Sequence, residues 1–242
     1  MEIELKYMYS LEPRKTSMGR TGPRAPRKPK PKTPLTEITL DLETEMDWQQ
    51  AKQLSDQPAL QLAAFANAPW IAVTGQQDGS TLTWSKFELL DLVKYLQNRI
   101  VTGWNINAFD LPIIALSAFR ARQTQWNAPI QSIDLFELIR RDTQVMFRLE
   151  NVAQLNLEQG KLGNSAAIPA LFKTLPAGEK WDQLEAYQQI VAHCQRDVLL
   201  ERQLLDKARS EGLRLPAVAA SKYLLDGLPE SKWAFPPTPE GP

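Results

Sequence analysis

The sequence has one cysteine and one histidine among its 242 residues. Cys194 has no second cysteine with which to form a disulfide within the chain, which is typical of proteins from reducing compartments. With His193 as the only histidine, neither a histidine-pair metal site nor a Cys/His zinc site can be assembled within one chain. No run of 18 apolar residues occurs, so we expect no membrane span, and we expect no secretory signal because an apolar segment does not follow the first charges. These absences favour a cytoplasmic protein.

The chain has 28 basic and 28 acidic residues, but they are unevenly distributed. Residues 1–34 hold nine Lys/Arg and three Asp/Glu, while the remainder holds 19 basic and 25 acidic residues. Prolines recur through 20–34, so we predict a disordered basic arm at 1–34. Such an arm could contact phosphates or only aid solubility. We also expect a disordered Pro-rich tail at 229–242, which leaves one domain at 35–228.

Apolar periodicity and turn residues between 35 and 228 predict alternating strands and helices. Expected strands lie at 36–43, 70–74, 81–84, 100–104 and 129–133. Expected helices follow the Ser85/Glu88 capping box, include Pro112 in a first turn, cover 135–141, and run from an Asp182 cap to about 210. Residues 45–66 are expected to be a helical or irregular insertion. The predicted fold class is α/β, a mixed five-stranded sheet with helices on both faces.

Asp41 and Glu43 end the first predicted strand. Residues two apart in a strand point to the same face, so their carboxylates should lie side by side at the end of the sheet. Two like charges this close are costly unless a cation lies between them. An Asp-x-Glu triplet is common by chance, so the pair needs further acidic partners before it indicates a metal site.

Two further acidic positions are candidates for that role. Asp110 follows a predicted strand end, although as a single residue before Leu-Pro it is better explained as a helix N-cap. Asp197 lies four residues after His193 in the long helix, which places both on one helical face. The alternatives are a solvent-facing Asp197 and a hydrogen-bonded core histidine. An all-oxygen set of carboxylates would select Mg²⁺ or Mn²⁺.

The order of these motifs carries a family resemblance. A strand-end Asp-x-Glu, then Asn-x-x-x-Phe-Asp ending at Asp110, then a helical Cys-x-x-Asp-Val starting at Cys194 resembles the DEDD 3′–5′ exonucleases of the ribonuclease H-like (DnaQ-like) superfamily. The likeness is greatest to the bacterial predicted exonucleases with a ribonuclease H-like domain, and it covers about residues 36–212. Supporting segments are Gly103-Trp104-Asn105-Ile106, Asp134-Leu135 and Leu157-Glu158-Gln159-Gly160-Lys161.

The resemblance implies a ribonuclease H-like fold and a site with two Mg²⁺ or Mn²⁺ ions. Its four metal-binding carboxylates would be Asp41, Glu43, Asp110 and Asp197. His193 would be the general base, although it departs from the family by standing where one subclass has Tyr and one position away from the histidine of the other. Substrate contacts would come from Thr44, Asn105, Phe109 and Lys161. A second departure is Glu158, where the family commonly has Gly.

The resulting interpretation is a metal-dependent 3′–5′ exonuclease that acts on DNA or RNA with no membrane association. Two alternatives from other classes stay open at this point. One is a non-catalytic nucleic-acid-binding module on the same fold, and the other is an acidic interaction domain whose carboxylates are solvated. A Mn²⁺-dependent shift in melting temperature would distinguish them, because the acidic interaction domain predicts no such shift.

Overall fold

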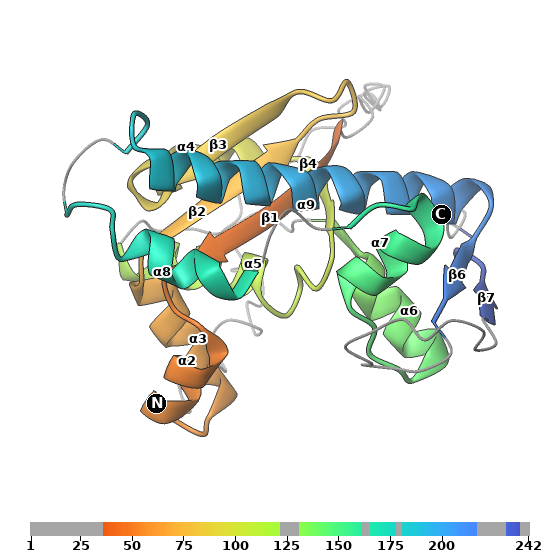
Figure 1. Cartoon of the computed structure of the whole chain (residues 1–242), viewed down its shortest axis with the longest axis horizontal. Helices are drawn as coiled ribbons and strands as arrows, with labels where there is room; N and C mark the ends of the chain where they lie inside the picture. The colour runs from red at the N-terminus through yellow and green to blue at the C-terminus, as the bar shows by residue number, and fades with distance from the viewer. Residues whose placement is uncertain (1–35, 122–130, 161–164, 178–180, 217–230, 238–242) are drawn as a thin grey trace, which may run out of the picture. The chain divides into compact units, whose positions relative to one another are not determined.

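The computed structural model describes residues 36–121, 131–160, 165–177, 181–216 and 231–237 (Figure 1). All of these belong to one compact unit, Leu35–Pro242. The predicted arm at 1–34, half of the predicted tail (229, 230 and 238–242) and the candidate residue Lys161 lie outside the described residues. None of the described helices is both long enough and apolar enough to cross a membrane.

A mixed five-stranded sheet forms the centre of the unit, with strand order β3-β2-β1-β4-β5. The strands are β1 (Thr36–Thr44), β2 (Trp70–Gly75), β3 (Thr81–Ser85), β4 (Arg99–Gly103) and β5 (Gln131–Asp134). β2 runs antiparallel to β1 and β3, while β1, β4 and β5 are parallel to one another. The hairpin between β2 and β3 turns at Gly79, whose φ of 84° suits glycine.

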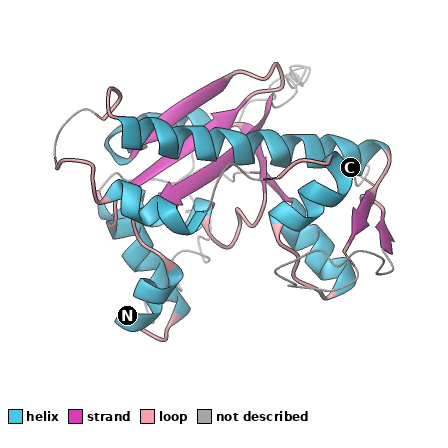
Figure 2. Cartoon of the chain, in the orientation of Figure 1, coloured by secondary structure: helices cyan, strands magenta, loops and turns pink. Residues whose placement is uncertain are grey.

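Helices cover both faces of the sheet (Figures 1 and 2). The long helix α9 (Glu185–Ser210) crosses one face and packs on β1, β2 and β4, and α8 (Ile168–Phe172) also packs on β1. The other face is covered by α4 (Leu89–Leu96) and α5 (Asp110–Arg120). This confirms the predicted fold class.

The remaining elements lie around this core. The expected insertion after β1 is a helical hairpin, α2 (Trp48–Leu54) and α3 (Pro58–Asn67), and α3 packs against α5. The capping-box residues Ser85 and Glu88 precede α4 through the short helix η1 (Lys86–Glu88). Further elements are α6 (Leu135–Thr143), α7 (Leu149–Leu157), η2 (Ser165–Ala167), β6 (Leu213–Leu215) and β7 (Ser231–Trp233).

Strand β1 alternates between the two faces, as a period of two requires. Ile38, Leu40 and Leu42 are buried with the α4 and α5 side chains. Their neighbours Asp41 and Glu43 therefore share the opposite face, as the sequence predicted for this pair, and that face packs against α9. The strand thus separates an apolar core from a polar site.

Gly75 sets how closely α9 approaches the sheet. A β-carbon added at Gly75 would collide with Cγ1 of Val198, the residue directly after Asp197. In the chain as it stands, Val198 packs with Val73 and Cys194 in a small buried cluster. The absent side chain therefore allows the part of α9 that carries Asp197 to lie against β2.

Two local predictions differ from the structure. Asp182 does not cap the long helix: α9 begins at Glu185 with Leu184 at the N-cap and no side-chain hydrogen bond there. The exposed backbone turn before it separates Asp182 from the helix. The fifth strand runs from Gln131 to Asp134, so its described part ends one residue later than expected, and Pro129 and Ile130 lie outside the described residues.

Candidate metal centre

Asp41 and Glu43 at the end of β1 lie opposite the buried face of α9. Nε2 of His193 is 3.3 Å from Oε1 of Glu43 and 3.9 Å from Oδ2 of Asp197. One ligand atom from each of these three residues lies within 4.8 Å of the others. The group therefore joins the end of β1 to one turn of α9, although α9 lies more than a hundred residues later in the sequence.

Asp41 is joined to the same place through its main chain. The thiol of Cys194 donates a hydrogen bond of 3.2 Å to the carbonyl oxygen of Asp41, which ties β1 to α9 between His193 and Asp197. Burial, and then the nearby Asp41 and Glu43 carboxylates, raise the pKa of this thiol well above its usual 9.0. Cys194 therefore stays protonated at neutral pH, which fits the predicted core position and disfavours a thiolate ligand.

Asp110 is the fourth acidic residue of the centre. It is the first residue of α5, where Phe109 and not Asp110 occupies the N-cap position, so the interpretation as an N-cap is wrong. Its side chain is buried, and its Oδ1 atom accepts no hydrogen bond from the residues that the structure describes. Burial, followed by repulsion from Asp41, raises its pKa well above 3.8, with smaller contributions from Asp134 and Glu43.

These environments favour a cation among the carboxylates. A buried carboxylate oxygen with no hydrogen-bond donor is costly, and so is the repulsion among neighbouring carboxylates. A divalent ion would remove both costs at once, and oxygen atoms suit Mg²⁺ and Mn²⁺. The residues present therefore fit the metal that the sequence pattern implies.

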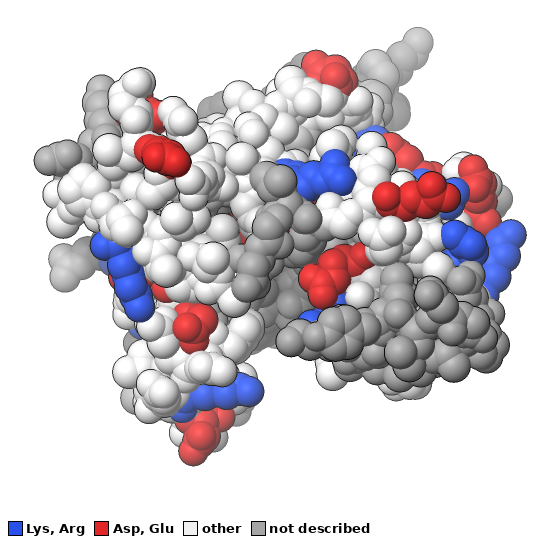
Figure 3. All heavy atoms as spheres, in the orientation of Figure 1, with Lys and Arg blue, Asp and Glu red and all other residues white. Residues whose placement is uncertain are grey.

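The acidic residues are not a solvated surface patch. Asp197 is 1% exposed and Asp110 is 4% exposed, so the expectation of a solvent-facing Asp197 is wrong. Among the described residues on the face drawn in Figure 3, exposed acidic and basic side chains lie in small, interspersed groups. The burial of these carboxylates disfavours the interpretation as an acidic interaction domain.

Asp134 has a part in the centre that the sequence did not indicate. Its carboxylate accepts hydrogen bonds from the backbone N–H groups of Asn105 and Asn107, each at 2.9 Å, and from that of Glu137 at 3.1 Å. It thereby caps α6 and also fixes the turn that leads into Asp110. The Asp134-Leu135 segment and the predicted strand end drew attention to this residue but not to its role, because the two turn contacts join residues almost thirty positions apart.

The three described residues predicted to bind substrate have defined local roles. The hydroxyl of Thr44 donates to the carbonyl oxygen of Met46 at 2.7 Å. Asn105 has a φ of 64°, and its carbonyl oxygen accepts from the N–H of Phe109. The Phe109 ring packs against Phe65 and Trp48, with centroid distances of 5.0 and 5.6 Å, and these two rings also contact each other.

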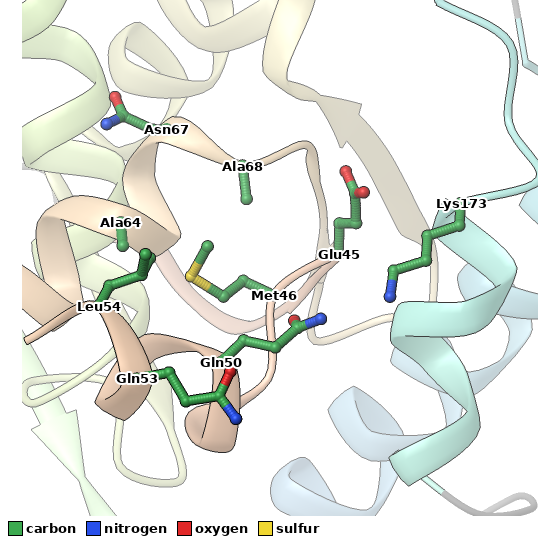
Figure 4. Close-up of a pocket in the computed structure, with 9 residues that line it drawn as sticks. All are labelled: Glu45, Met46, Gln50, Gln53, Leu54, Ala64, Asn67, Ala68 and Lys173. Carbon is green, nitrogen blue, oxygen red and sulfur yellow. The ribbon is translucent and has the colours of Figure 1, made fainter.

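A groove of about 500 Å³ opens beside the end of β1 (Figure 4). Its walls include Glu45 and Met46 after β1, polar side chains of α2 and α3, and Lys173 at the end of α8. Lys173 extends into the groove from the side opposite α2. The groove begins two residues after Glu43, and none of the four carboxylates lines it.

No protein-family model and no curated protein matches the chain. Among solved structures, it is similar to a family B DNA polymerase from the hyperthermophilic archaeon Pyrobaculum calidifontis, with a TM-score of 0.48 and 16% identity over 72% of this chain and 24% of the polymerase. It is also similar to E. coli Exonuclease I in complex with a 5cy-dA13 oligonucleotide, with a TM-score of 0.35 and 13% identity over 73% of this chain and 41% of the exonuclease. The chain thus spans less than half of either protein, and at these TM-scores its function has to be argued from the site.

Proposed function

We propose that the chain is a metal-dependent 3′–5′ exonuclease that hydrolyses phosphodiester bonds in nucleic acid. The observation that carries the proposal is the convergence of four carboxylates from β1, α5 and α9 with an unsatisfied buried oxygen on Asp110. The order of these residues along the chain, and their resemblance to the DEDD exonucleases, agree with this chemistry.

Asp41, Glu43, Asp110 and Asp197 would hold two Mg²⁺ or Mn²⁺ ions. Bound at such a site, two divalent ions activate a water and stabilise the charge on the attacking and leaving oxygens. In the overall reaction the water oxygen bonds to phosphorus, the bond from phosphorus to the 3′ oxygen breaks, and that oxygen gains a proton. The chain's own contribution is to hold the carboxylates in a buried place where they are kept close despite their mutual repulsion.

The groove beside β1 gives this proposal a place for the substrate. It opens directly after the Asp-x-Glu segment, and Lys173 could neutralise a backbone phosphate there. Amide side chains of α2 and α3 on the opposite wall can donate to and accept from base edges. We therefore propose an unpaired 3′ end as the substrate at this place, with its backbone near Lys173.

Digestion of labelled oligonucleotides tests the proposal. Single- and double-stranded DNA and RNA, labelled at the 5′ end, should give a ladder of progressively shorter products with Mn²⁺ or Mg²⁺ and none with EDTA. Asp41→Asn and Asp197→Asn should abolish the ladder while their circular dichroism stays that of the wild type. Asp91→Asn is the matched control, because Asp91 is an exposed helical aspartate paired only with Lys94. Full cleavage by purified Asp197→Asn would refute the proposal.

A further inference from the structure

The imidazole of His193 lies directly beside the carboxylates of Glu43 and Asp197. Its side chain is 4% exposed, and Nε2 lies within 4 Å of oxygens from both β1 and α9. The sequence suggested a general base, a role that needs this nitrogen to face a water. The same nitrogen cannot bind an ion and accept a proton at once, so its position decides between two roles.

The distances resemble those between ligands of one ion. Two ligand atoms each about 2.1 Å from an ion are about 3.0 Å apart at right angles and about 3.4 Å apart at a tetrahedral angle. The separation of Nε2 from Oε1 of Glu43 is 3.3 Å, and that from Oδ2 of Asp197 is 3.9 Å. All three atoms could therefore reach a common ion with small side-chain rotations.

We infer that His193 is a direct nitrogen ligand of one metal ion, together with Glu43 and Asp197. The inference rests on the proposed function only for the presence of divalent ions. The buried Oδ1 of Asp110, which accepts no hydrogen bond, is the independent sign that the centre is built for a cation. His193 then has a different role from the phenol that the resembling exonucleases carry at this position.

An imidazole ligand changes which ion the centre prefers. Mg²⁺ binds oxygen almost exclusively, whereas Mn²⁺ and the later first-row dications accept imidazole nitrogen. A site with one nitrogen and several carboxylates thus discriminates against Mg²⁺ more strongly than an all-oxygen site does. The expected physiological cofactor at this position is a transition-metal dication, with Mn²⁺ as the convenient probe.

Because the chain has one histidine, the inference can be tested by isotope labelling. The full-length protein is prepared without a histidine tag, with ¹⁵N-histidine as the only labelled residue, and loaded with Mn²⁺. Pulsed electron paramagnetic resonance should detect coupling between the manganese electron spin and ¹⁵N. Bound Mn²⁺ with no ¹⁵N coupling would overturn the inference and leave His193 as a base, and so would failure to bind Mn²⁺.

Titration calorimetry with each metal gives a second readout. His193→Tyr, which supplies the residue of the resembling family, should weaken Mn²⁺ binding about tenfold while changing Mg²⁺ binding by less than about twofold. Gln189→Tyr, an exposed substitution one turn earlier on α9, is the control and should change neither. Equal Mn²⁺ affinity in the wild type and a folded His193→Tyr protein would contradict the inference.

The two proposals fail separately. Labelled protein that shows ¹⁵N coupling to Mn²⁺ yet cleaves no oligonucleotide would refute the exonuclease function and keep the ligand assignment. A chain that cleaves from the 3′ end but shows no such coupling would refute the ligand assignment alone.

Discussion

The carboxylate of Asp134 accepts a hydrogen bond of 2.9 Å from the backbone N–H of Asn105, at the turn between β4 and α5. This bond and its companion from Asn107 hold the turn that ends at Asp110. Asp134, the last residue of β5, therefore positions Asp110, a proposed metal ligand that begins α5. The turn that it holds connects α5 to the neighbouring strand β4. Asp134 is not itself a proposed ligand, but the loss of its hydrogen bonds should weaken metal binding at the proposed site.

Asp134→Ala should reduce both stability and metal affinity. It removes the acceptor for three backbone N–H groups, so we expect a loss of about 3 kcal/mol in the free energy of unfolding and weaker Mn²⁺ binding. Urea unfolding and calorimetry measure the two effects. Asp47→Ala is the control, because Asp47 caps only α2 through the N–H of Gln50; it should cost about 1 kcal/mol and leave Mn²⁺ affinity unchanged. Unaltered Mn²⁺ affinity in a folded Asp134→Ala protein would show that the turn does not position Asp110.

Asp110 should make the metal-free protein less stable as pH rises. Its folded pKa is raised above the usual 3.8, so the folded state binds more protons than the unfolded state between these two values. The contribution is fully favourable below 3.8 and is lost as pH rises through the raised folded pKa. Melting temperatures in EDTA should show a flatter decline with pH for Asp110→Asn than for the wild type.

Divalent ions provide the control for this pH effect. Mn²⁺ binds the ionised carboxylates, so it should stabilise the wild type more as pH rises and stabilise Asp110→Asn much less. Identical pH profiles for the two proteins in EDTA would contradict the assignment of the raised pKa to Asp110.

Glu158→Gly should stabilise the protein. Glu158 follows α7 with a φ of 55°, a left-handed conformation that costs a residue with a β-carbon about 1 kcal/mol and costs glycine little. We expect the melting temperature to rise by about 2–4 °C. Glu158→Ala removes the carboxylate but keeps the β-carbon, so it separates the backbone effect from charge; an equal rise in both variants would exclude the backbone explanation.

Lys173→Ala should weaken binding of single-stranded oligonucleotides without altering metal affinity. The loss of one phosphate contact should lower affinity severalfold and reduce the slope of log affinity against log salt by about 0.7. Fluorescence anisotropy in the Asp41→Asn background avoids cleavage during the measurement. Lys232→Ala, an exposed lysine on β7, serves as the charge-matched control. An unchanged salt slope would place the substrate strand outside the groove.

Much of the fold followed from local pattern. The spacing of Asp41 and Glu43 predicted that they share one face of β1, and the Ser85/Glu88 pair predicted a helix start. These features depend on neighbours within a few residues. The Asp182 cap failed because the same Asp-x-x-Glu spacing also occurs in turns, and only the surrounding chain decides where a helix begins.

The candidate site was accessible to sequence reasoning only in part. The residue types and their order predicted the four acidic positions, but not how His193 lies relative to Glu43. That distance depends on the packing of α9 against β1, which no spacing along the chain encodes. The hydrogen bonds of Asp134 and the left-handed φ of Glu158 could not be predicted either. The first depends on a segment distant in the sequence, and the second depends on the backbone conformation after α7.

Because Gly75 has no side chain, the position of α9 relative to the sheet depends on how the core residues pack there. Asp41 and Glu43 belong to the sheet, whereas Asp197 and His193 belong to α9, so the separation between these two pairs depends on the apolar residues packed between β1, β2 and α9. Val198, the residue after Asp197, lies so close to Gly75 that a β-carbon there would collide with it. Buried residues that touch none of the proposed ligands would therefore affect the affinity of the proposed site, and a change in their volume would alter its ion binding as well as the stability of the core.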